Sequence, residues 1–233
     1  MTRYALYFAP EVGSQWWLAG CQWLGRDTVA MRAITPPPIK GLNAETVHEL
    51  TDNARRYGFH ATLKAPFHLA GTQTAASLEQ ALHAFCQRQR PVIVPAPQVQ
   101  WMGGFLALRP HTECPAIHAL AQRCVNHFAE LSAPLSSPEL ERRNNRRLTS
   151  RQQALLQRWG SPYTEEEFSF YLALSDNLKT GDDSTASVLR DAAVKHFQIA
   201  EMMCIRGISL FCESAPGANF QLLHHYPFAL AEQ

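Results

Sequence analysis

The segment Phe59-His60-Ala61-Thr62-Leu63 combines residue types that can carry out acid–base chemistry. Side chains of a strand alternate between its two faces, so a strand here would place His60, Thr62 and Lys64 on one face and apolar side chains on the other. An imidazole can take up or release a proton near neutral pH, and a hydroxyl can hydrogen-bond to an anionic oxygen. The segment therefore predicts a half-buried strand that presents an acid–base site to a cleft.

A second segment, Phe170-Tyr171-Leu172-Ala173-Leu174, has the same apolar frame. Tyr171 and Ala173 stand where the first segment has its His and Thr, and positions 60 and 171 are 111 residues apart in a chain of 233. This spacing indicates an internal duplication in which one copy of the site has changed. Because tyrosine has a pKa of ~10, Tyr171 would be a proton donor rather than a base. His60 would then be the neutral base of the pair.

The elements that must position these residues follow a repeated order. Strand, helix, loop, motif strand, helix and strand are expected over residues 4–100, and a similar series with an inserted helical segment over residues 105–228. We therefore expect an α+β fold with two pseudo-symmetric lobes, each a mostly antiparallel sheet flanked by helices, and a cleft between them. The expected boundaries are a single bilobal domain 1–233, a first half 1–102 with motif strand 57–69, and a second half 103–233 with helical insert 137–160 and motif strand 168–175.

The composition limits the partners. A hydrophobic content of 46% and a charged content of 18% describe a globular chain, and the formal net charge of +1 makes nucleic acid an unlikely ligand. No stretch approaches the ~18 apolar residues of a membrane-spanning helix, and the N-terminal apolar run is too short for a signal peptide. We expect a cytoplasmic protein whose six scattered cysteines are reduced. His224-His225 lacks the spacing of metal ligands, so no metal site is expected.

The residues around the first motif carry a family resemblance. The string from Arg55 to Phe67, RRYGFHATLKAPF, resembles the first motif of the two-histidine (2H) phosphoesterase superfamily. More closely, it is similar to the branch associated with phosphonate metabolism. The similarity runs nearly from end to end, and its other matching segments are RYALYFAP at 3–10, WLGRD at 23–27, GGFLAL at 103–108, LTSRQ at 148–152 and RWG at 158–160.

The resemblance implies a function. In such enzymes two H-x-T/S strands line a cleft from opposite lobes and act on a small cyclic or linear phosphodiester without a metal or another cofactor. One histidine removes a proton from the attacking oxygen, the other protonates the leaving oxygen, and the hydroxyls hold the phosphate. The catalytic residues of this chain would be His60, Thr62 and Tyr171. The substitution of both functional positions in the second motif puts the second histidine's role in doubt.

Further residues are candidates for substrate binding. On a continuous helix Arg143, Arg147 and Arg151 would lie on one face, either as a solvated surface or as an arm that binds a second phosphate. Ser175 is in phase with Tyr171 and either replaces the missing hydroxyl or ends the strand. The full set of expected substrate-binding residues is Arg56, Tyr57, Lys64, Arg143, Arg147, Arg151 and Ser175.

Two functional hypotheses remain open. In the first, the chain is a monomeric phosphoesterase that requires His60. In the second, it is a catalytically impaired relative that only binds a phosphorylated metabolite or nucleotide. A protein-interaction module with a vestigial cleft is less well supported, because His60, Thr62 and nearby arginines are present.

Overall fold

The computed structural model describes residues 1–144, 148–178 and 183–229. Its main element is an antiparallel four-stranded sheet with the order β11-β10-β1-β4. The strands are β1 (Arg3–Phe8), β4 (Ala61–Phe67), β10 (Gly207–Glu213) and β11 (Gln221–Pro227). The side chains from Ala5 to Phe8 are all buried, because β1 is an inner strand with an apolar cluster on each face.

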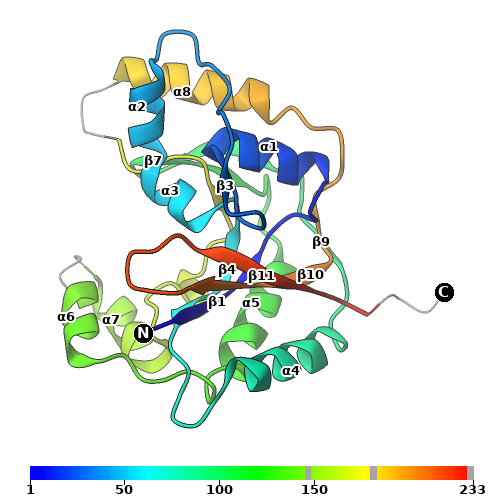
Figure 1. Ribbon diagram of the computed structural model, residues 1–233, viewed down its shortest axis with the longest axis vertical. Coiled ribbons are helices and arrows are strands. Elements are labelled where there is room, and N and C mark those ends of the chain that lie inside the picture. The colour runs from blue at the N-terminus through cyan, green and yellow to red at the C-terminus, as the bar shows by residue number, and fades with distance from the viewer. Residues whose placement is uncertain (145–147, 179–182, 230–233) are drawn as a thin grey trace.

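Helices cover both faces of this sheet. Helices α4 (Ala75–Cys86) and α5 (Pro115–His127) lie on one side, and α1 (Gln15–Leu24) and α3 (Asp52–Tyr57) lie on the other (Figure 1). Leu6 and Phe8 belong to the large apolar cluster, which contains residues of α4 and α5 and also part of α1. On the α1 side, Trp17 and Cys21 pack with Ala5 and Tyr7 in a smaller cluster. The alternation of side chains along β1 thus separates two layers of core.

The remaining elements are short. A three-stranded antiparallel sheet has the order β6-β7-β8, and two further pairs are β2-β3 and β5-β9. The strand bounds are β2 (Arg26–Asp27), β3 (Arg32–Ala33), β5 (Val92–Ile93), β6 (Gln98–Met102), β7 (Phe105–Arg109), β8 (Leu172–Ala173) and β9 (Cys204–Ile205). The other helices are α2 (Ala44–Leu50), α6 (Ser137–Asn144), α7 (Ser150–Trp159), the 3-10 helix η1 (Glu165–Glu167) and α8 (Asp183–His196). None of the helices in the described ranges is both long enough and apolar enough to cross a membrane.

The α+β class with antiparallel sheets is confirmed, but the expected two-lobed pseudo-symmetry is not shown. The four-stranded sheet takes β1 and β4 from the first half of the chain and β10 and β11 from the second. The second sheet has three strands, and its motif strand β8 is two residues long. Two equivalent lobes would need two equivalent sheets, whereas here the two halves of the chain share one.

The helical insert expected at 137–160 corresponds to α6 and α7. Helix α7 begins with the capping box expected from the sequence, in which Thr149 accepts from the Gln152 amide and the Gln152 side chain accepts from the Thr149 amide. It ends at Gly160 in the left-handed conformation.

Candidate functional site

His60 lies at the entrance to β4, directly after a sharp change of chain direction. Helix α3 ends at Gly58, which has a φ of +85°, and a Cβ atom there would stand 2.2 Å from a Thr28 methyl carbon. Only glycine fits both the backbone angle and this close approach. The turn brings the His60 ring onto Tyr7, with centroids 3.8 Å apart and an angle of 28° between the rings. Tyr57 and Phe211 complete the aromatic surroundings at 6.1 and 6.2 Å.

The hydrogen bonds of His60 define how its two ring nitrogens are used. Nδ1 lies 2.9 Å from the carbonyl oxygen of Gly58, which can only accept, so Nδ1 carries the proton. Nε2 is then the acceptor of the neutral ring, and the hydroxyl of the exposed Thr62 lies 3.4 Å from it. Burial lowers the pKa of His60 to about 4, against a smaller opposing effect of the Gly58 hydrogen bond. At pH 7 the imidazole is therefore a neutral base with its basic nitrogen beside a hydroxyl.

Lys64 departs from the expected alternation, and its predicted place beside His60 and Thr62 is wrong. Thr62 pairs with Tyr7, but Lys64 pairs with the next residue, Leu6, because the register shifts between them. Such a bulge places one extra residue in β4 and turns Lys64 to the other face of the sheet. Its ammonium lies 5.0 Å from the centroid of the Phe67 ring, and burial lowers its pKa to about 8.

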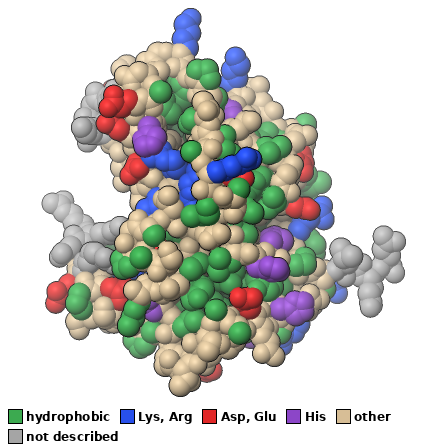
Figure 2. Space-filling model, viewed as in Figure 1, with side chains coloured by type: hydrophobic (Ala, Val, Ile, Leu, Met, Phe, Trp, Pro, Cys, Tyr) green, Lys and Arg blue, Asp and Glu red, His purple; other side chains and the backbone are tan. Residues whose placement is uncertain are grey.

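A cavity of about 930 Å³ lies beside Tyr57 and contains three arginines, Arg3, Arg56 and Arg143. We call it the arginine cavity. It is bounded by the start of β1, the end of α3, the helix α6 and the turn between β10 and β11. Figure 1 shows the N-terminus beside α6 and α7, and Figure 2 shows Lys and Arg side chains gathered over α3 and β3. The other residues that line the arginine cavity are Met1, Tyr57, Pro66, His68, Leu69, Ala133, Pro134, Ser136, Glu139, Ser161, Pro162, Tyr163, Pro216 and Gly217.

A buried carboxylate holds two of these arginines in place. Glu213, at the end of β10, is fully buried and forms ion pairs with both Arg3 and Arg56. Burial alone would raise the pKa of Glu213, but hydrogen bonding to Arg3 and the arginine charges lower it below its ordinary value. The Arg56 guanidinium also lies 4.9 Å from the Tyr57 ring centroid. Two guanidinium groups sharing one carboxylate keep an excess positive charge at this wall.

The sequence predicted part of this cavity and missed the rest. Arg56, Tyr57 and Arg143 were expected to bind substrate, and the structure brings all three to one cavity. Arg3 and Glu213 were not expected, although one signal was available. Glu213 ends a strand that is apolar apart from Ser209, and a carboxylate buried in such a strand requires a cationic partner. The identity of that partner could not be read from the sequence, because Arg3 and Glu213 are 210 residues apart.

The predicted arginine arm is only partly present. Arg143 lines the arginine cavity and donates to the carbonyl oxygen of Gly160. Arg151 instead pairs with Glu165 and Glu166 at the surface. Arg147 lies outside the described residues. The expected single face of three arginines is thus replaced by one cavity residue and one surface ion pair.

The second motif has a structural environment of its own. The Tyr171 ring packs against Phe105 at 5.3 Å, whereas the ring contacts found for His60 among the described residues are with Tyr7, Tyr57 and Phe211. Ala173 pairs with Ala107 in the small sheet.

Ser175, the last candidate of the second motif, is buried. Its hydroxyl hydrogen-bonds to the Leu106 amide at 2.9 Å and to the Asp176 carbonyl at 2.9 Å. Asp176 in turn accepts from the amides of Asn53 and Ala54 at the start of α3. The end of the second motif therefore anchors the helix that leads to His60, and we leave Ser175 out of the site.

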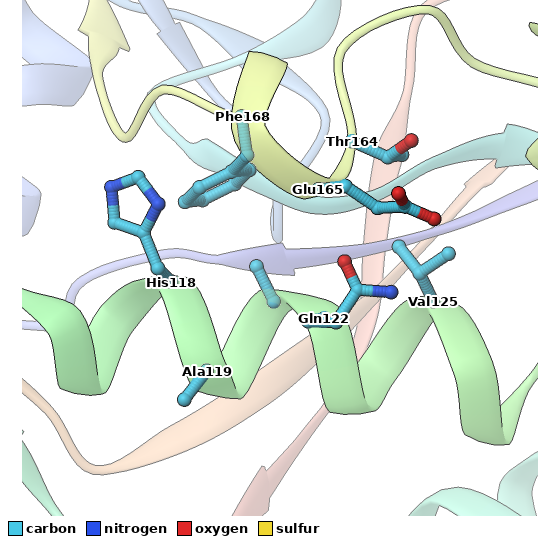
Figure 3. A pocket seen from close by; sticks show the side chains of 8 residues that line it. His118, Ala119, Gln122, Val125, Thr164, Glu165 and Phe168 are labelled. Atoms are coloured by element: carbon cyan, nitrogen blue, oxygen red, sulfur yellow. The ribbon is translucent and has the colours of Figure 1, made fainter. Parts of the chain in front are cut away.

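A smaller cavity of about 260 Å³ lies between α5 and residues 164–168 (Figure 3). His118 meets Phe168 edge-on at 5.0 Å, and the Thr164 hydroxyl is buried with no hydrogen-bond partner in the described parts of the chain. The Glu165 carboxylate is already bound by Arg151 and by the Trp159 indole. None of the described residues that line this cavity is a lysine or an arginine. No group of three or more His, Cys, Asp or Glu side chains that could hold a metal occurs among the described residues.

The fold and the site define a mixed α+β protein with a neutral histidine next to a cavity rich in arginine. Comparison with known families assigns it: the chain belongs to the family described as protein of unknown function (DUF1045), whose model matches residues 62–221.

Two curated relatives are similar along nearly the whole chain. Both are named ribose 1,5-bisphosphate phosphokinase PhnN. The protein from Janthinobacterium sp. (strain Marseille) is 41% identical over 232 residues, which are 98% of this chain and 51% of the relative. The protein from Laribacter hongkongensis (strain HLHK9) is 34% identical over 221 residues, which are 94% of this chain and 50% of the relative. The chain spans about half the length of the curated relatives it matches.

Proposed function

We propose that this chain binds a small phosphorylated metabolite at His60 and Thr62 and hydrolyses a cyclic or linear phosphodiester there without a metal. The observation that carries the proposal is the fixed neutral imidazole. Gly58 holds the proton on Nδ1, so that Nε2 is the basic atom and lies 3.4 Å from the Thr62 hydroxyl. With a pKa of about 4 the imidazole is deprotonated at pH 7, so its Nε2 is available to accept a proton.

The proposed reaction uses water as the nucleophile. His60 Nε2 takes a proton from water, the water oxygen bonds to phosphorus, and the bond from phosphorus to the leaving oxygen breaks. The Thr62 hydroxyl donates to a non-bridging phosphate oxygen. A phenol supplies the proton to the leaving oxygen and later regains one from the imidazolium through solvent.

The phenol is either Tyr171, from the second motif, or Tyr57. Tyr57 has the better support, since its ring lies 6.1 Å from that of His60 and also lines the arginine cavity. Comparing Tyr57→Phe with Tyr171→Phe separates the two, because only the variant that removes the proton donor lowers turnover.

The relatives support a phosphorylated sugar as the ligand. Their printed names refer to ribose 1,5-bisphosphate, a small molecule with two phosphate groups. We extend to this chain only the chemical class, a phosphorylated sugar; a link to phosphonate metabolism is the expectation from the resemblance of the first motif.

The test is hydrolysis of a 2′,3′-cyclic nucleotide and of a ribose 1,2-cyclic phosphate by purified protein. We expect His60→Ala to lower kcat/KM by about 10²–10⁴-fold, the usual contribution of a general base. Thr62→Val should lower it less, and the exposed His83→Ala should leave it unchanged. Wild-type turnover equal to that of His60→Ala would contradict hydrolysis.

The second candidate is binding without turnover. It is favoured by the loss of His and Thr from the second motif and by the packing of Tyr171 on Phe105. In that case neither cyclic phosphate is hydrolysed, but both raise the melting temperature of the wild type and not that of Thr62→Val.

A further inference from the structure

Among the described residues, more guanidinium groups than carboxylates line the arginine cavity. Arg3, Arg56 and Arg143 line it, against one lining carboxylate, Glu139. When the buried Glu213 is included, the described residues at this cavity comprise three guanidinium groups and two carboxylates. Glu139 is itself close to His68, with 3.5 Å between its Oε1 and Nε2 of the histidine. A cavity with this balance favours an anionic ligand, and arginine forms paired hydrogen bonds with phosphate oxygens.

The buried ion pair prepares the site for binding. Glu213 fixes the guanidinium groups of Arg3 and Arg56, which are 15% and 22% exposed. Arg56 is held further by hydrogen bonds from Nε to the carbonyls of Gly217 and Ala218, both 3.1 Å. Side chains already held in one geometry lose less entropy when a ligand arrives.

Tyr57 connects the arginine cavity to the surroundings of His60, since it lines the cavity and its ring lies 6.1 Å from that of His60. The Arg56 guanidinium lies over the Tyr57 ring, and that ring is the neighbour of His60. Arg3 and Tyr7 point to the same face of β1, and they are about 13 Å apart along the strand at 3.3 Å per residue. His60 stacks on Tyr7, so one face of the sheet presents His60 at one end and the arginines at the other. A sugar with a phosphate at each end has the matching arrangement of charge.

We propose that the arginine cavity binds the second phosphate of a sugar whose first phosphate lies at His60 and Thr62. The substrate class is then a small sugar that carries a cyclic or linear phosphodiester at one position and a second phosphate at another, and Tyr57 lies between the two anion sites. A sugar bisphosphate presents the same two anionic groups and serves as the binding probe. This inference rests on the proposed function, since it takes the His60 site as the place of the first phosphate.

The test is calorimetric titration of the protein with ribose 1,5-bisphosphate and with ribose 5-phosphate at constant ionic strength. Wild type should bind the bisphosphate about 10-fold or more tightly than the monophosphate, the gain expected from one charge-assisted site. Arg143→Gln should reduce this ratio to about one. Arg151→Gln, on the same helical insert but paired at the surface, is the matched control and should preserve the ratio.

A variant that should tighten binding distinguishes the proposed site from a general loss of structure. Glu139→Gln keeps an acceptor for the Ser136 amide but removes the only lining carboxylate of the cavity among the described residues. It should tighten bisphosphate binding by about threefold, which a loss of structure would not do. Equal affinities for the two ligands in wild type would overturn the inference. A parallel loss of both affinities in Arg143→Gln would also overturn it, because one anion site would then bind both ligands.

The two proposals fail separately. If the affinity ratio depends on Arg143 but no phosphodiester is hydrolysed, the bisphosphate site stands and the hydrolytic function falls. If His60→Ala abolishes turnover while wild type binds ribose 1,5-bisphosphate and ribose 5-phosphate with equal affinity, hydrolysis stands and the bisphosphate inference falls.

Discussion

At the scale of the residue, His60 shows how a local hydrogen bond and an aromatic environment convert a common side chain into a base. The Gly58 carbonyl selects the tautomer, and burial against Tyr7 keeps the ring neutral. The same imidazole on the surface would be partly protonated near neutral pH and could not be assigned a role. The chemistry of the site therefore depends on two neighbours that contribute no reactive group.

The depressed pKa of His60 predicts a dependence of stability on pH. The folded state holds the neutral ring down to about pH 4, whereas the unfolded chain takes up a proton near pH 6.5. The stabilisation is therefore complete above pH 6.5 and is lost as the pH falls towards 4. In His60→Gln, the free energy of unfolding should fall by about 1–3 kcal/mol less over this pH range than in wild type, allowing for partial solvent screening.

Chemical denaturation of wild type and His60→Gln at pH 7 and pH 4.5 measures this difference. The exposed His83→Gln should decline in parallel with the wild type. Parallel curves for wild type and His60→Gln would show that His60 has an ordinary pKa.

Lys64 gives a second prediction at this scale. It is 4% exposed, and burial lowers its pKa to about 8, so the folded protein carries a destabilising charge below that pH. Stability should rise between pH 8 and about 10.5 as the folded state loses the proton first. Lys64→Met should remove this rise and stabilise the protein by about 1–3 kcal/mol at pH 7. Thermal denaturation across this pH range tests it, with the exposed Lys195→Met as the control; a destabilised Lys64→Met protein would contradict the account.

At the scale of the element, strand alternation correctly predicted that His60 and Thr62 lie on the same face of β4, but it failed at Lys64. The face of a strand residue follows from its distance in sequence only while the ladder is regular. A bulge adds one residue and reverses the later positions, and nothing in the order Thr62, Leu63, Lys64 marks it. The caps of α7 were easier to predict from the sequence, because Thr149, Gln152 and Gly160 act through contacts a few residues apart.

The contact between α1 and the motif gives a prediction at the same scale. A Cβ atom on Gly20 would lie 2.0 Å from the Phe59 ring, so the helix backbone packs directly on the residue before His60. In an exposed helix position Gly→Ala stabilises by about 1 kcal/mol. Gly20→Ala should instead destabilise by about 1–3 kcal/mol, because Phe59 must move.

The free energy of unfolding of Gly20→Ala shows directly whether the substitution destabilises the protein. Activity on the cyclic phosphates reports whether His60 moves with Phe59. Gln22→Ala, on the exposed side of α1, is the control and should have little effect on either quantity. A stabilised Gly20→Ala protein would mean that the helix does not approach Phe59 as described.

At the scale of the whole molecule, the sequence predicted the α+β class and failed to predict the pairing of the halves. The repeated order of elements suggested two pseudo-symmetric lobes, but β10 returns to pair with β1, and β11 pairs with β10 at the edge of the same sheet. Such long-range pairing cannot be read from local patterns, and it is the reason Arg3 and Glu213 meet. The arginine cavity is a product of this return, since its walls come from both ends of the chain.

The protonation and tautomer of the His60 ring test the proposed site most directly. The proton–nitrogen NMR spectrum of the imidazole groups at pH 7 reports both, and comparison of wild type with His60→Gln assigns the His60 signals. We predict a neutral ring with its proton on Nδ1, and an Nε2 signal that shifts when ribose 1,2-cyclic phosphate is added. A protonated ring, or an Nε2 signal that does not respond to saturating phosphate ester, would contradict a phosphoester site at His60.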